Sequence, residues 1–174
     1  MRKALFALLG ILGLASPAQA ALPIGAAAPD FTTVGALAGK PFKLNLKSQL
    51  RKGPVVLYFY PKAFTKGCTL EAHAFSDHMA DFKKAGAQVI GMSADNLDTL
   101  KKFSTEECRD AFPVASATPE IQKAYDVAWA EHPGLTTRTS YVIARNGKIA
   151  MVHDDLDWSK HVSMAMDVVK SLKK

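Results

Sequence analysis

A buried strand followed by an amphipathic helix is the clearest pattern in the chain. Residues 55–60, VVLYFY, form an apolar run rich in β-branched and aromatic side chains with a proline on either side, which is typical of a core strand. Further on, apolar side chains recur at the helical period, at Ala72, Phe75, Met79 and Phe82. This spacing predicts one continuous helix that begins just before Cys68 and ends near Gly86, with Glu71 on its polar face.

Strand and helix patterns alternate through the middle of the chain. Residues 42–46 are predicted to form the second arm of an N-terminal hairpin, and QVIGMS at 88–93 is predicted to be a second central strand. Because a strand, a helix and a strand at this spacing imply a right-handed crossover, we expect 88–93 to pair in parallel with 55–60. Asp95 is expected to cap the next helix, which reaches about Glu107.

The last third of the chain predicts a short helix, a hairpin and a final helix. Thr118 and Pro119 have the residue types of an N-cap and of a first helical position. Strands are predicted at 139–144 and 148–153, since the Asn-Gly pair between them is a strong hairpin signal, and 159–173 is amphipathic at the helical period. The chain therefore predicts an α/β fold with a central mixed β-sheet flanked by helices, an arrangement that resembles the thioredoxin-like fold.

The N-terminus has the three parts of a secretory signal peptide. Two basic residues precede an almost wholly apolar stretch at 4–15, and Ala-Gln-Ala at 18–20 is a small-residue cleavage motif. The apolar stretch is shorter than a membrane span needs, and a retained anchor or lipoprotein signal is the alternative. We therefore expect residues 1–20 to be cleaved as a signal peptide, residues 21–174 to form a single domain, and the protein to be periplasmic or secreted.

The distribution of charge and the number of cysteines exclude some classes of function. The chain has 22 basic and 16 acidic residues, so that loss of the two basic residues of the signal leaves a net charge of about +4. Because this excess is spread along the chain without interleaved aromatic residues, no nucleic-acid-binding surface is expected. Cys68 and Cys108 lie 40 residues apart, and in an oxidising compartment such a pair favours a structural or catalytic disulfide. Without a C-x-x-C motif, a thioredoxin-type dithiol oxidoreductase lacks its main requirement.

Cys68 is expected in the first turn of a helix that follows a core strand. Unpaired backbone N–H groups and the positive end of the helix dipole point towards a sulfur in that position. Both favour the thiolate, which is the nucleophilic form of cysteine. A reactive cysteine is therefore one interpretation, and a small buried residue that happens to begin a helix is the other.

The residues around Cys68 resemble the active-site signature of a known family. Pro61, Thr65 and Cys68 form P-x-x-x-T-x-x-C within YFYPKAFTKGCTLEA, which resembles the signature of the peroxiredoxins and is most similar to their bacterioferritin-comigratory, or Q-type, branch. Ala-Pro-Asp-Phe at 28–31 is similar to the opening of many members. The resemblance implies that Cys68 is the peroxidatic cysteine, that the Thr65 hydroxyl orients the peroxide and that Pro61 shields the sulfur.

Arg138 completes the site that the resemblance implies. It lies just before the strand predicted at 139–144, where it matches the family's arginine. A guanidinium near Cys68 would stabilise the thiolate and orient the peroxide through its planar donors. Without the resemblance, Arg138 would be interpreted as a surface arginine in a loop.

The sequence leaves the role of Cys108 open. Many members of the branch carry a resolving cysteine five residues after the peroxidatic one, but that position is His73 here, and other members place it in the next helix. On the helix predicted to start at Asp95, Cys108 lies about 13 residues, hence ~20 Å, along the axis, whereas a disulfide needs Cα atoms within about 7 Å. Cys108 is therefore a resolving cysteine that requires partial unwinding, or an inert buried thiol in a cycle that an external thiol completes.

The resemblance implies a thiol peroxidase that reduces hydrogen peroxide and alkyl hydroperoxides, with Cys68 cycling through a sulfenic acid and a disulfide. A thioredoxin-like protein or another thiol would be the reductant, and the protein would be a monomer. No metal, haem, flavin or nucleotide cofactor is implied, nor any membrane contact after cleavage of the signal. The five histidines are interpreted as solvated or locally hydrogen-bonded side chains. The alternatives on the same fold are a thiol–disulfide exchange protein and a redox or copper-binding module, for which Cys68 lacks a C-x-x-C or C-x-x-x-C partner.

Overall fold

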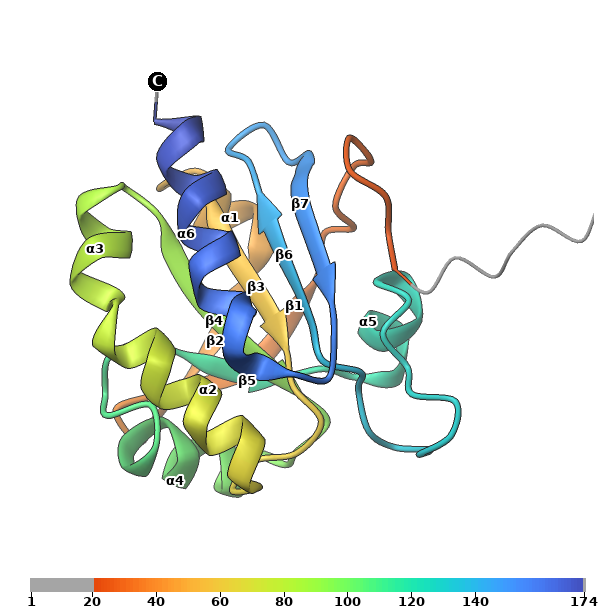
Figure 1. The fold of residues 1–174 in the computed structure, drawn as a ribbon. Coiled ribbons are helices and arrows are strands. Elements are labelled where there is room, and N and C mark those ends of the chain that lie inside the picture. The colour runs from red at the N-terminus through yellow and green to blue at the C-terminus, as the bar shows by residue number, and fades with distance from the viewer. Residues whose placement is uncertain (1–20, 174) are drawn as a thin grey trace, which may run out of the picture.

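The computed structural model describes residues 21–173, which form a seven-stranded sheet covered by helices (Figure 1). The strands are β1 Thr32–Leu37, β2 Lys40–Asn45, β3 Val55–Phe59, β4 Gln88–Ser93, β5 Val114–Ser116, β6 Thr139–Ile143 and β7 Ile149–Asp154. The helices are α1 Leu46–Leu50, α2 Lys66–Asp77, α3 Met79–Lys84, α4 Leu97–Glu106, α5 Pro119–Ala124, the 3-10 helix η1 Trp158–Lys160 and α6 His161–Leu172. The sheet order is β2-β1-β5-β4-β3-β6-β7, with β3 parallel to β4 and antiparallel to β6, so the predicted mixed sheet is confirmed.

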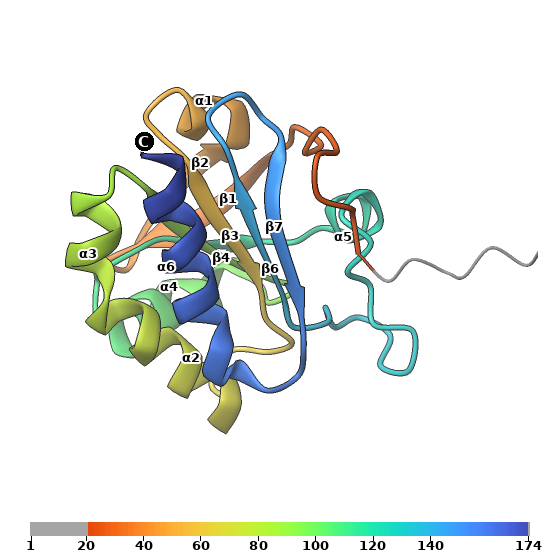
Figure 2. The ribbon, with the colours of Figure 1, turned by 45° about the horizontal axis from the view of Figure 1, so that its top comes forward.

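The central strand β3 supplies both halves of the core, since each of its residues is buried. Val56 and Tyr58 join a cluster with α2, α3, α4 and α6, whereas Leu57 and Phe59 join a second cluster with α1 and α5. This division follows from the alternation of side chains along a strand. Figures 1 and 2 both show α2, α3 and α6 side by side on one face of the sheet. α2 therefore begins after β3 leaves the sheet and packs on the face that α3 and α6 also cover.

The two predicted hairpins are confirmed. β1 pairs with β2 and β6 pairs with β7, both antiparallel. Gly147 lies in the turn of the second hairpin at φ 82°, the left-handed conformation that glycine adopts most readily. The predicted short helix is also present as α5, where the Thr118 hydroxyl accepts the N–H of Ile121.

The helix that carries Cys68 is shorter than the hydrophobic pattern predicts. α2 and α3 are separated at His78, whose φ is −100° and ψ is 4°. The ring Nδ1 of His78 donates to the carbonyl of Ala74 at 2.9 Å, the group that the backbone N–H of His78 would bond in a continuous helix. That N–H bonds the carbonyl of Phe75 instead, at 3.2 Å. The prediction of one continuous helix is therefore wrong, because a local side-chain bond competes with the backbone ladder.

Asp95 does not cap the helix that follows β4. Asn96 has that role, with its side-chain oxygen accepting the N–H of Thr99 at 3.0 Å. The carboxylate of Asp95 instead accepts the backbone N–H of Ala63 and the hydroxyl of Ser93, both at 2.8 Å. The capping prediction is therefore wrong by one residue, and Asp95 ties the loop between β3 and α2 to the end of β4.

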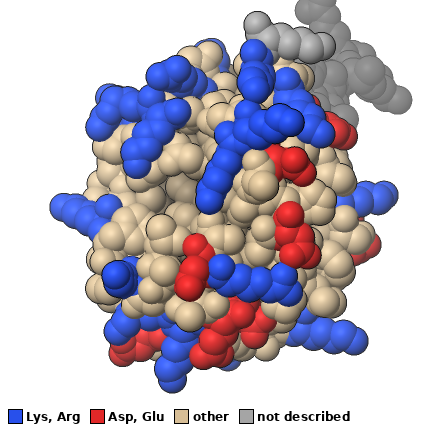
Figure 3. Space-filling model, turned by 90° about the vertical axis from the view of Figure 1, so that its left-hand side faces the viewer, with Lys and Arg blue, Asp and Glu red and all other residues tan. Residues whose placement is uncertain are grey.

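The positive charge of the described surface is not evenly distributed. On the face in Figure 3, Lys and Arg side chains gather towards the end where α6 finishes, and at the opposite end they alternate with Asp and Glu. Figure 1 shows the start of α2 at that opposite, mixed end. No helix within residues 21–173 is long and apolar enough to cross a membrane. The signal peptide predicted at 1–20 lies outside the described residues.

Candidate active site

The loop between β3 and α2 sets the position of Cys68. After Tyr60 and Pro61, the backbone of Phe64 enters the left-handed region at φ 63° and turns the chain into α2. The ring of Phe64 packs edge-on against Phe103, with ring centroids 5.3 Å apart, and this contact offsets part of the cost of that conformation. Cys68 is then the third residue of α2 and is only 1% exposed.

Thr65 is the N-cap residue of α2, but its hydroxyl does not cap the helix. The hydroxyl donates to the carbonyl of Lys62 at 2.9 Å, and the backbone carbonyl of Thr65 accepts the N–H of Thr69 at 2.9 Å. The N–H groups of the first helical turn have no partner within a helix, so they can bind a ligand there. Thr65 is exposed and Pro61 is half-buried, which leaves both of them accessible from solvent beside Cys68.

Arg138 lies against Cys68 and is 6% exposed. Nε donates to the carbonyl of Leu156 at 2.9 Å, Nη2 lies 3.5 Å from the Cys68 sulfur, and Nη1 donates to the carboxylate of Glu71. Although burial acts against its charge, the pKa of Arg138 is raised by the neighbouring acidic groups of Glu71 and Cys68 and by its hydrogen bonds to them. The guanidinium is therefore a fixed positive charge beside the sulfur.

Gly67 makes room for this guanidinium. A Cβ atom on Gly67 would lie 3.1 Å from Nη2 of Arg138 and 3.9 Å from Cδ1 of Trp158. A side chain at this position would press on Arg138, so the close approach depends on glycine. Trp158, at the start of η1, packs against the same turn of α2.

Glu71 is a site residue that the sequence pattern assigned to the wrong face of the helix. It is fully buried, and its Oε2 accepts a hydrogen bond from Arg138. Burial raises the pKa of Glu71 to about 8, while Arg138 acts in the opposite direction. The spacing contained the signal, because the position three residues after Cys68 lies on the same helical face.

His161 is a second buried polar residue that the sequence did not single out. It is the first residue of α6 and is fully buried. Its Nε2 donates to the carbonyl of Asp155 at 2.9 Å, and its Nδ1 lies 2.8 Å from the hydroxyl of Ser140 and 3.7 Å from Oε1 of Glu71. Burial lowers the pKa of His161 to about 4. Of the two interpretations of the histidines, local hydrogen bonding applies to His161. Within residues 21–173, no three His, Cys, Asp or Glu side chains gather as metal ligands would.

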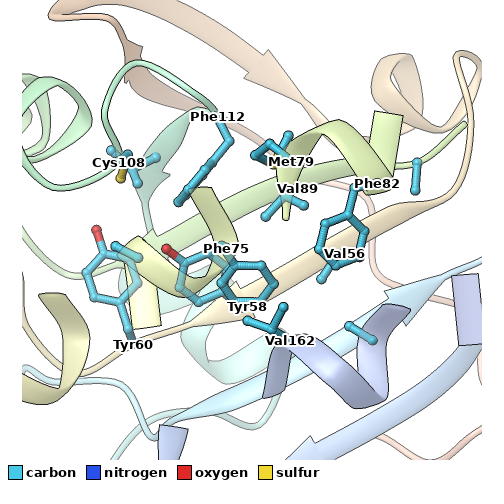
Figure 4. Close-up of a cluster of buried hydrophobic side chains, with 14 of the residues drawn as sticks. Val56, Tyr58, Tyr60, Phe75, Met79, Phe82, Val89, Cys108, Phe112 and Val162 are labelled. Atoms are coloured by element: carbon cyan, nitrogen blue, oxygen red, sulfur yellow. The ribbon is translucent and has the colours of Figure 1, made fainter. Parts of the chain in front are cut away.

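Cys108 is fully buried in the core cluster beyond α4. Figure 4 shows it near Tyr60 and Phe112. Burial raises the pKa of its thiol well above the ordinary value, and the negative charges of Glu107 and Asp110 add to this effect. The thiol is therefore protonated at neutral pH and is a poor nucleophile in this position.

Polar contacts join the Cys108 loop to the second half of α2. They run from Ser76 to the Cys108 carbonyl at 2.9 Å, from His73 to Glu107 at 2.7 Å and from Asp77 to Arg109 at 2.8 Å. Ser76 follows Cys68 by eight residues, which corresponds to about 12 Å along α2. Both cysteines are free thiols. Because the backbone of Cys108 is held at Ser76 while Cys68 lies in the first turn of the same helix, a disulfide between the two cysteines would require part of α2 to unwind.

The sequence of this chain was compared with protein families and with proteins of known function. Residues 24–152 match the AhpC/TSA family. The chain is 33% identical over 150 residues to the chloroplastic peroxiredoxin Q of Sedum lineare, which covers 86% of this chain and 78% of the relative. It is also 33% identical over 123 residues to peroxiredoxin Bcp of Escherichia coli strain K12, over 67% of this chain and 78% of that protein.

The solved structures that superimpose on this chain include peroxiredoxins of the same kind. Peroxidoxin BcpB from Mycobacterium tuberculosis superimposes with a TM-score of 0.74 at 30% identity, over 85% of this chain and 96% of that one. Peroxiredoxin Q of Xanthomonas campestris superimposes with a TM-score of 0.70 at 26% identity, over 81% and 91%.

A thioredoxin-like sheet with a buried cysteine at a helix start, beside a fixed guanidinium, defines a thiol-based oxidoreductase. The chain belongs to the AhpC/TSA family, and within it to the peroxiredoxins of the bacterioferritin-comigratory, or Q-type, branch. It is a thiol peroxidase, which reduces peroxide at the expense of a thiol reductant. The family indicated by P-x-x-x-T-x-x-C is therefore confirmed.

Proposed function

We propose that Cys68 is the peroxidatic cysteine of this thiol peroxidase. The observation that carries the proposal is the contact between its sulfur and Arg138 at the start of α2. The guanidinium and the helix dipole both favour the thiolate. The thiolate attacks the terminal oxygen of ROOH, so that an S–O bond forms and the O–O bond breaks. Cys68 becomes a sulfenic acid, and the leaving alkoxide takes up a proton to become the alcohol.

The groups around the sulfur are suited to holding the peroxide. Arg138 and the free N–H groups of the first turn of α2 donate towards the oxygen on which negative charge develops. The hydroxyl of Thr65, which bonds the Lys62 carbonyl in the resting site, can donate to one peroxide oxygen and accept from the other after rotation. Pro61 shields the sulfur from bulk water. Hydrogen peroxide and alkyl hydroperoxides share the O–O group that these residues bind, and both are proposed substrates.

Cys108 is the proposed resolving cysteine. Its sulfur reaches Cys68 once part of α2 unwinds and leaves the Cys108 loop. Two of the contacts that hold the loop to α2, the Asp77–Arg109 ion pair and the His73–Glu107 hydrogen bond, are partly solvent-exposed, and exposed pairs of this kind contribute little stability. Arg109 and Asp110 in the same loop have φ values of 52° and 57°, a strained conformation for residues other than glycine. Both features favour local opening of this region.

Intact mass after one equivalent of hydrogen peroxide tests both assignments. Wild type is expected to lose two hydrogens, Cys108→Ser to gain one oxygen, and Cys68→Ser to remain unchanged. A wild type that gains oxygen without forming a disulfide would show that an external thiol completes the cycle, which overturns the role of Cys108 alone. If Cys68 fails to react at peroxide concentrations that spare ordinary thiols, the role of Cys68 is wrong.

The proposed setting is the periplasm or the exterior of the cell, where the protein acts as a monomer and a thioredoxin-like protein or another thiol reduces its disulfide. The signal-peptide pattern at 1–20 supports export, and the resemblance to the Q-type branch supports the monomer. Expression of the full chain followed by fractionation should yield exported protein that begins at Ala21 and has the mass of one chain by light scattering. Intact Met1 on cytoplasmic protein would contradict export, and a multiple of the mass would contradict the monomer.

A further inference from the structure

Glu71 and His161 form a fully buried polar pair next to Arg138. The two oxygens of Glu71 have different surroundings: Oε2 accepts from Arg138, whereas Oε1 has no hydrogen-bond partner within residues 21–173. Nδ1 of His161 lies 3.7 Å from Oε1. Because a bare oxygen on a buried carboxylate is costly, the protonation state of Glu71 requires a physical explanation.

The hydrogen bonds of His161 fix which of its nitrogens carries a proton. The carbonyl of Asp155 can only accept, so Nε2, 2.9 Å away, is protonated. In the neutral ring, Nδ1 therefore carries a lone pair, which accepts the Ser140 hydroxyl at 2.8 Å and also faces Oε1 of Glu71 at 3.7 Å, beyond hydrogen-bond distance. That lone pair repels an ionised Oε1, but it attracts the hydrogen of a protonated one.

The balance of charges at the site also favours a protonated Glu71. Arg138 contacts two acidic groups, the sulfur of Cys68 and the carboxylate of Glu71. If both were ionised, one guanidinium would face two buried negative charges, and burial penalises the uncompensated one. With Glu71 protonated, the charges of Arg138 and the Cys68 thiolate cancel.

We propose that Glu71 is a neutral, protonated acid in the reduced enzyme, with Oε2 holding Arg138 and the proton on Oε1 directed at His161. Glu71 is then a positioning residue that fixes the guanidinium without neutralising it and leaves its charge to Cys68. Oxidation removes the negative charge from Cys68, so Glu71 gives up its proton while the leaving alkoxide gains one. The sum is Glu71–COOH plus Cys68–S⁻ plus ROOH giving Glu71–COO⁻ plus Cys68–SOH plus ROH, in which atoms and charge balance. The inference rests on the proposed role of Cys68.

The other groups that face the pair are consistent with this assignment. They are Arg138, the buried Tyr58, His153, whose ring centroid lies 4.5 Å from that of His161, and Asp155. Burial is the largest influence on both members: it raises the pKa of Glu71 to about 8 and lowers that of His161 to about 4. At neutral pH Glu71 therefore carries a proton and His161 is neutral.

Proton counting during oxidation tests the inference. The parent protein is Cys108→Ser, which stops at the sulfenic acid, and it is mixed with one equivalent of hydrogen peroxide at pH 7 in weak buffer containing a pH indicator. Glu71→Gln is added to this parent because glutamine copies the neutral acid, accepting from Arg138 through its carbonyl and placing its N–H₂ group on the side of His161. We expect no net proton uptake by the parent and uptake of one proton per Cys68 in the Glu71→Gln variant. Equal counts in the two proteins would overturn the inference.

A control variant and a mass measurement distinguish a failure of the inference from a failure of the proposed function. Glu106→Gln, which removes an exposed carboxylate of α4, should count protons as the parent does. Intact mass of the same samples shows whether oxygen was added: absence of oxygen at Cys68 refutes the proposed function, whereas normal oxidation with equal counts refutes only the role of Glu71.

An infrared measurement on the parent alone does not depend on the folding of Glu71→Gln. The reduced-minus-oxidised difference spectrum should contain the band of a protonated carboxyl group in the reduced protein and a carboxylate band in the oxidised protein. Carboxylate bands without a protonated carboxyl group would overturn the inference.

Discussion

At the scale of single residues, Arg138 is irreplaceable because each of its nitrogens has a different partner. The ammonium of Arg138→Lys cannot reach the Leu156 carbonyl, Glu71 and the Cys68 sulfur together. We expect the second-order rate constant for Cys68 oxidation to fall by about 100-fold, the scale on which loss of one preorganised donor acts. Stopped-flow oxidation by hydrogen peroxide measures it. Arg145→Lys, an exposed arginine that bonds a backbone carbonyl, is the matched control, and a rate for Arg138→Lys close to that of wild type would contradict the assignment.

Substitution of Gly67 by alanine is expected to slow Cys68 oxidation without lowering the stability of the protein. In Gly67→Ala the new methyl group would lie 3.1 Å from Nη2 of Arg138, and the guanidinium has to move away from Cys68. Since a misplacement of about 1 Å costs on the order of 100-fold in rate, the smaller shift here should slow Cys68 oxidation roughly tenfold. Alanine favours a helix over glycine by up to about 1 kcal/mol, so the free energy of unfolding should not fall. Lower stability with an unchanged oxidation rate would show that Arg138 is not displaced.

The site residues that the sequence revealed are those whose chemistry is local to a motif. Cys68, Thr65 and Pro61 share one loop, and Arg138 could be placed by its position before a strand. Glu71 was missed because the charge of a glutamate was taken to indicate a solvated face, although its spacing from Cys68 put it on the buried one.

His161 and Asp95 could not be placed from spacing. Each acts through contacts with residues distant in the chain: His161 faces Glu71, and Asp95 binds the N–H of Ala63. These contacts form only when α6 packs against α2 and the end of β4 packs against the loop between β3 and α2, so no local sequence pattern predicts them.

At the scale of elements, α2 connects the two cysteines. Its first turn holds Cys68, and near its end the hydroxyl of Ser76 shares its proton between the carbonyls of Ala72 at 2.8 Å and Cys108 at 2.9 Å. Ser76→Ala removes that donor and should reduce the stability of the closed region by about 1 kcal/mol, which raises the population of the opened state about fivefold. If Cys108 resolves Cys68, disulfide formation after peroxide addition should accelerate by a similar factor while the oxidation phase is unchanged. Two-phase stopped-flow fluorescence measures both rates.

Ser163→Ala is the matched control for this prediction. The hydroxyl of Ser163 donates only to the carbonyl of Lys160, in the turn before α6, so its loss should leave both phases unchanged. A slower oxidation phase in Ser76→Ala would mean that the first turn of α2 was disturbed. An unchanged second phase despite lower stability would show that opening of this contact does not limit the disulfide.

The pattern of hydrophobic residues predicted which elements exist better than where they end. The β3 strand, the crossover to β4 and the final hairpin follow from periodicity and turn residues that act over a few positions. The break between α2 and α3 depends on the ring of His78 taking the carbonyl of Ala74. A competition between a side chain and the backbone does not change the spacing of apolar residues. The pattern therefore continued through His78 and did not predict the break.

At the scale of the whole molecule, the site is assembled from three distant parts of the chain. α2 brings Cys68 and Glu71, the segment before β6 brings Arg138, and the start of α6 brings His161. The fold must hold these groups together against the cost of burying them, which couples the protonation of the site to global stability.

That coupling predicts an unusual dependence of stability on pH. Burial raises the pKa of Glu71 from 4.5 to about 8, so over this range the folded state keeps a proton that the unfolded state has lost, and stability falls as pH rises. His161, whose pKa is lowered from 6.5 to about 4, acts in the opposite direction below pH 6.5 and cancels much of this effect there. Between pH 6.5 and 8 the contribution of Glu71 amounts to about 1.4 kcal/mol per pH unit.

Urea unfolding of reduced wild type and Glu71→Gln across this range isolates the contribution, because all other groups titrate alike in both proteins. The free energy of unfolding of wild type should decrease relative to that of Glu71→Gln by about 2 kcal/mol between pH 6.5 and 8. Glu106→Gln should run parallel to wild type, since its carboxylate is exposed. A constant difference between wild type and Glu71→Gln over this range would mean that Glu71 is already ionised when the protein is folded, with Arg138 shared between two anions.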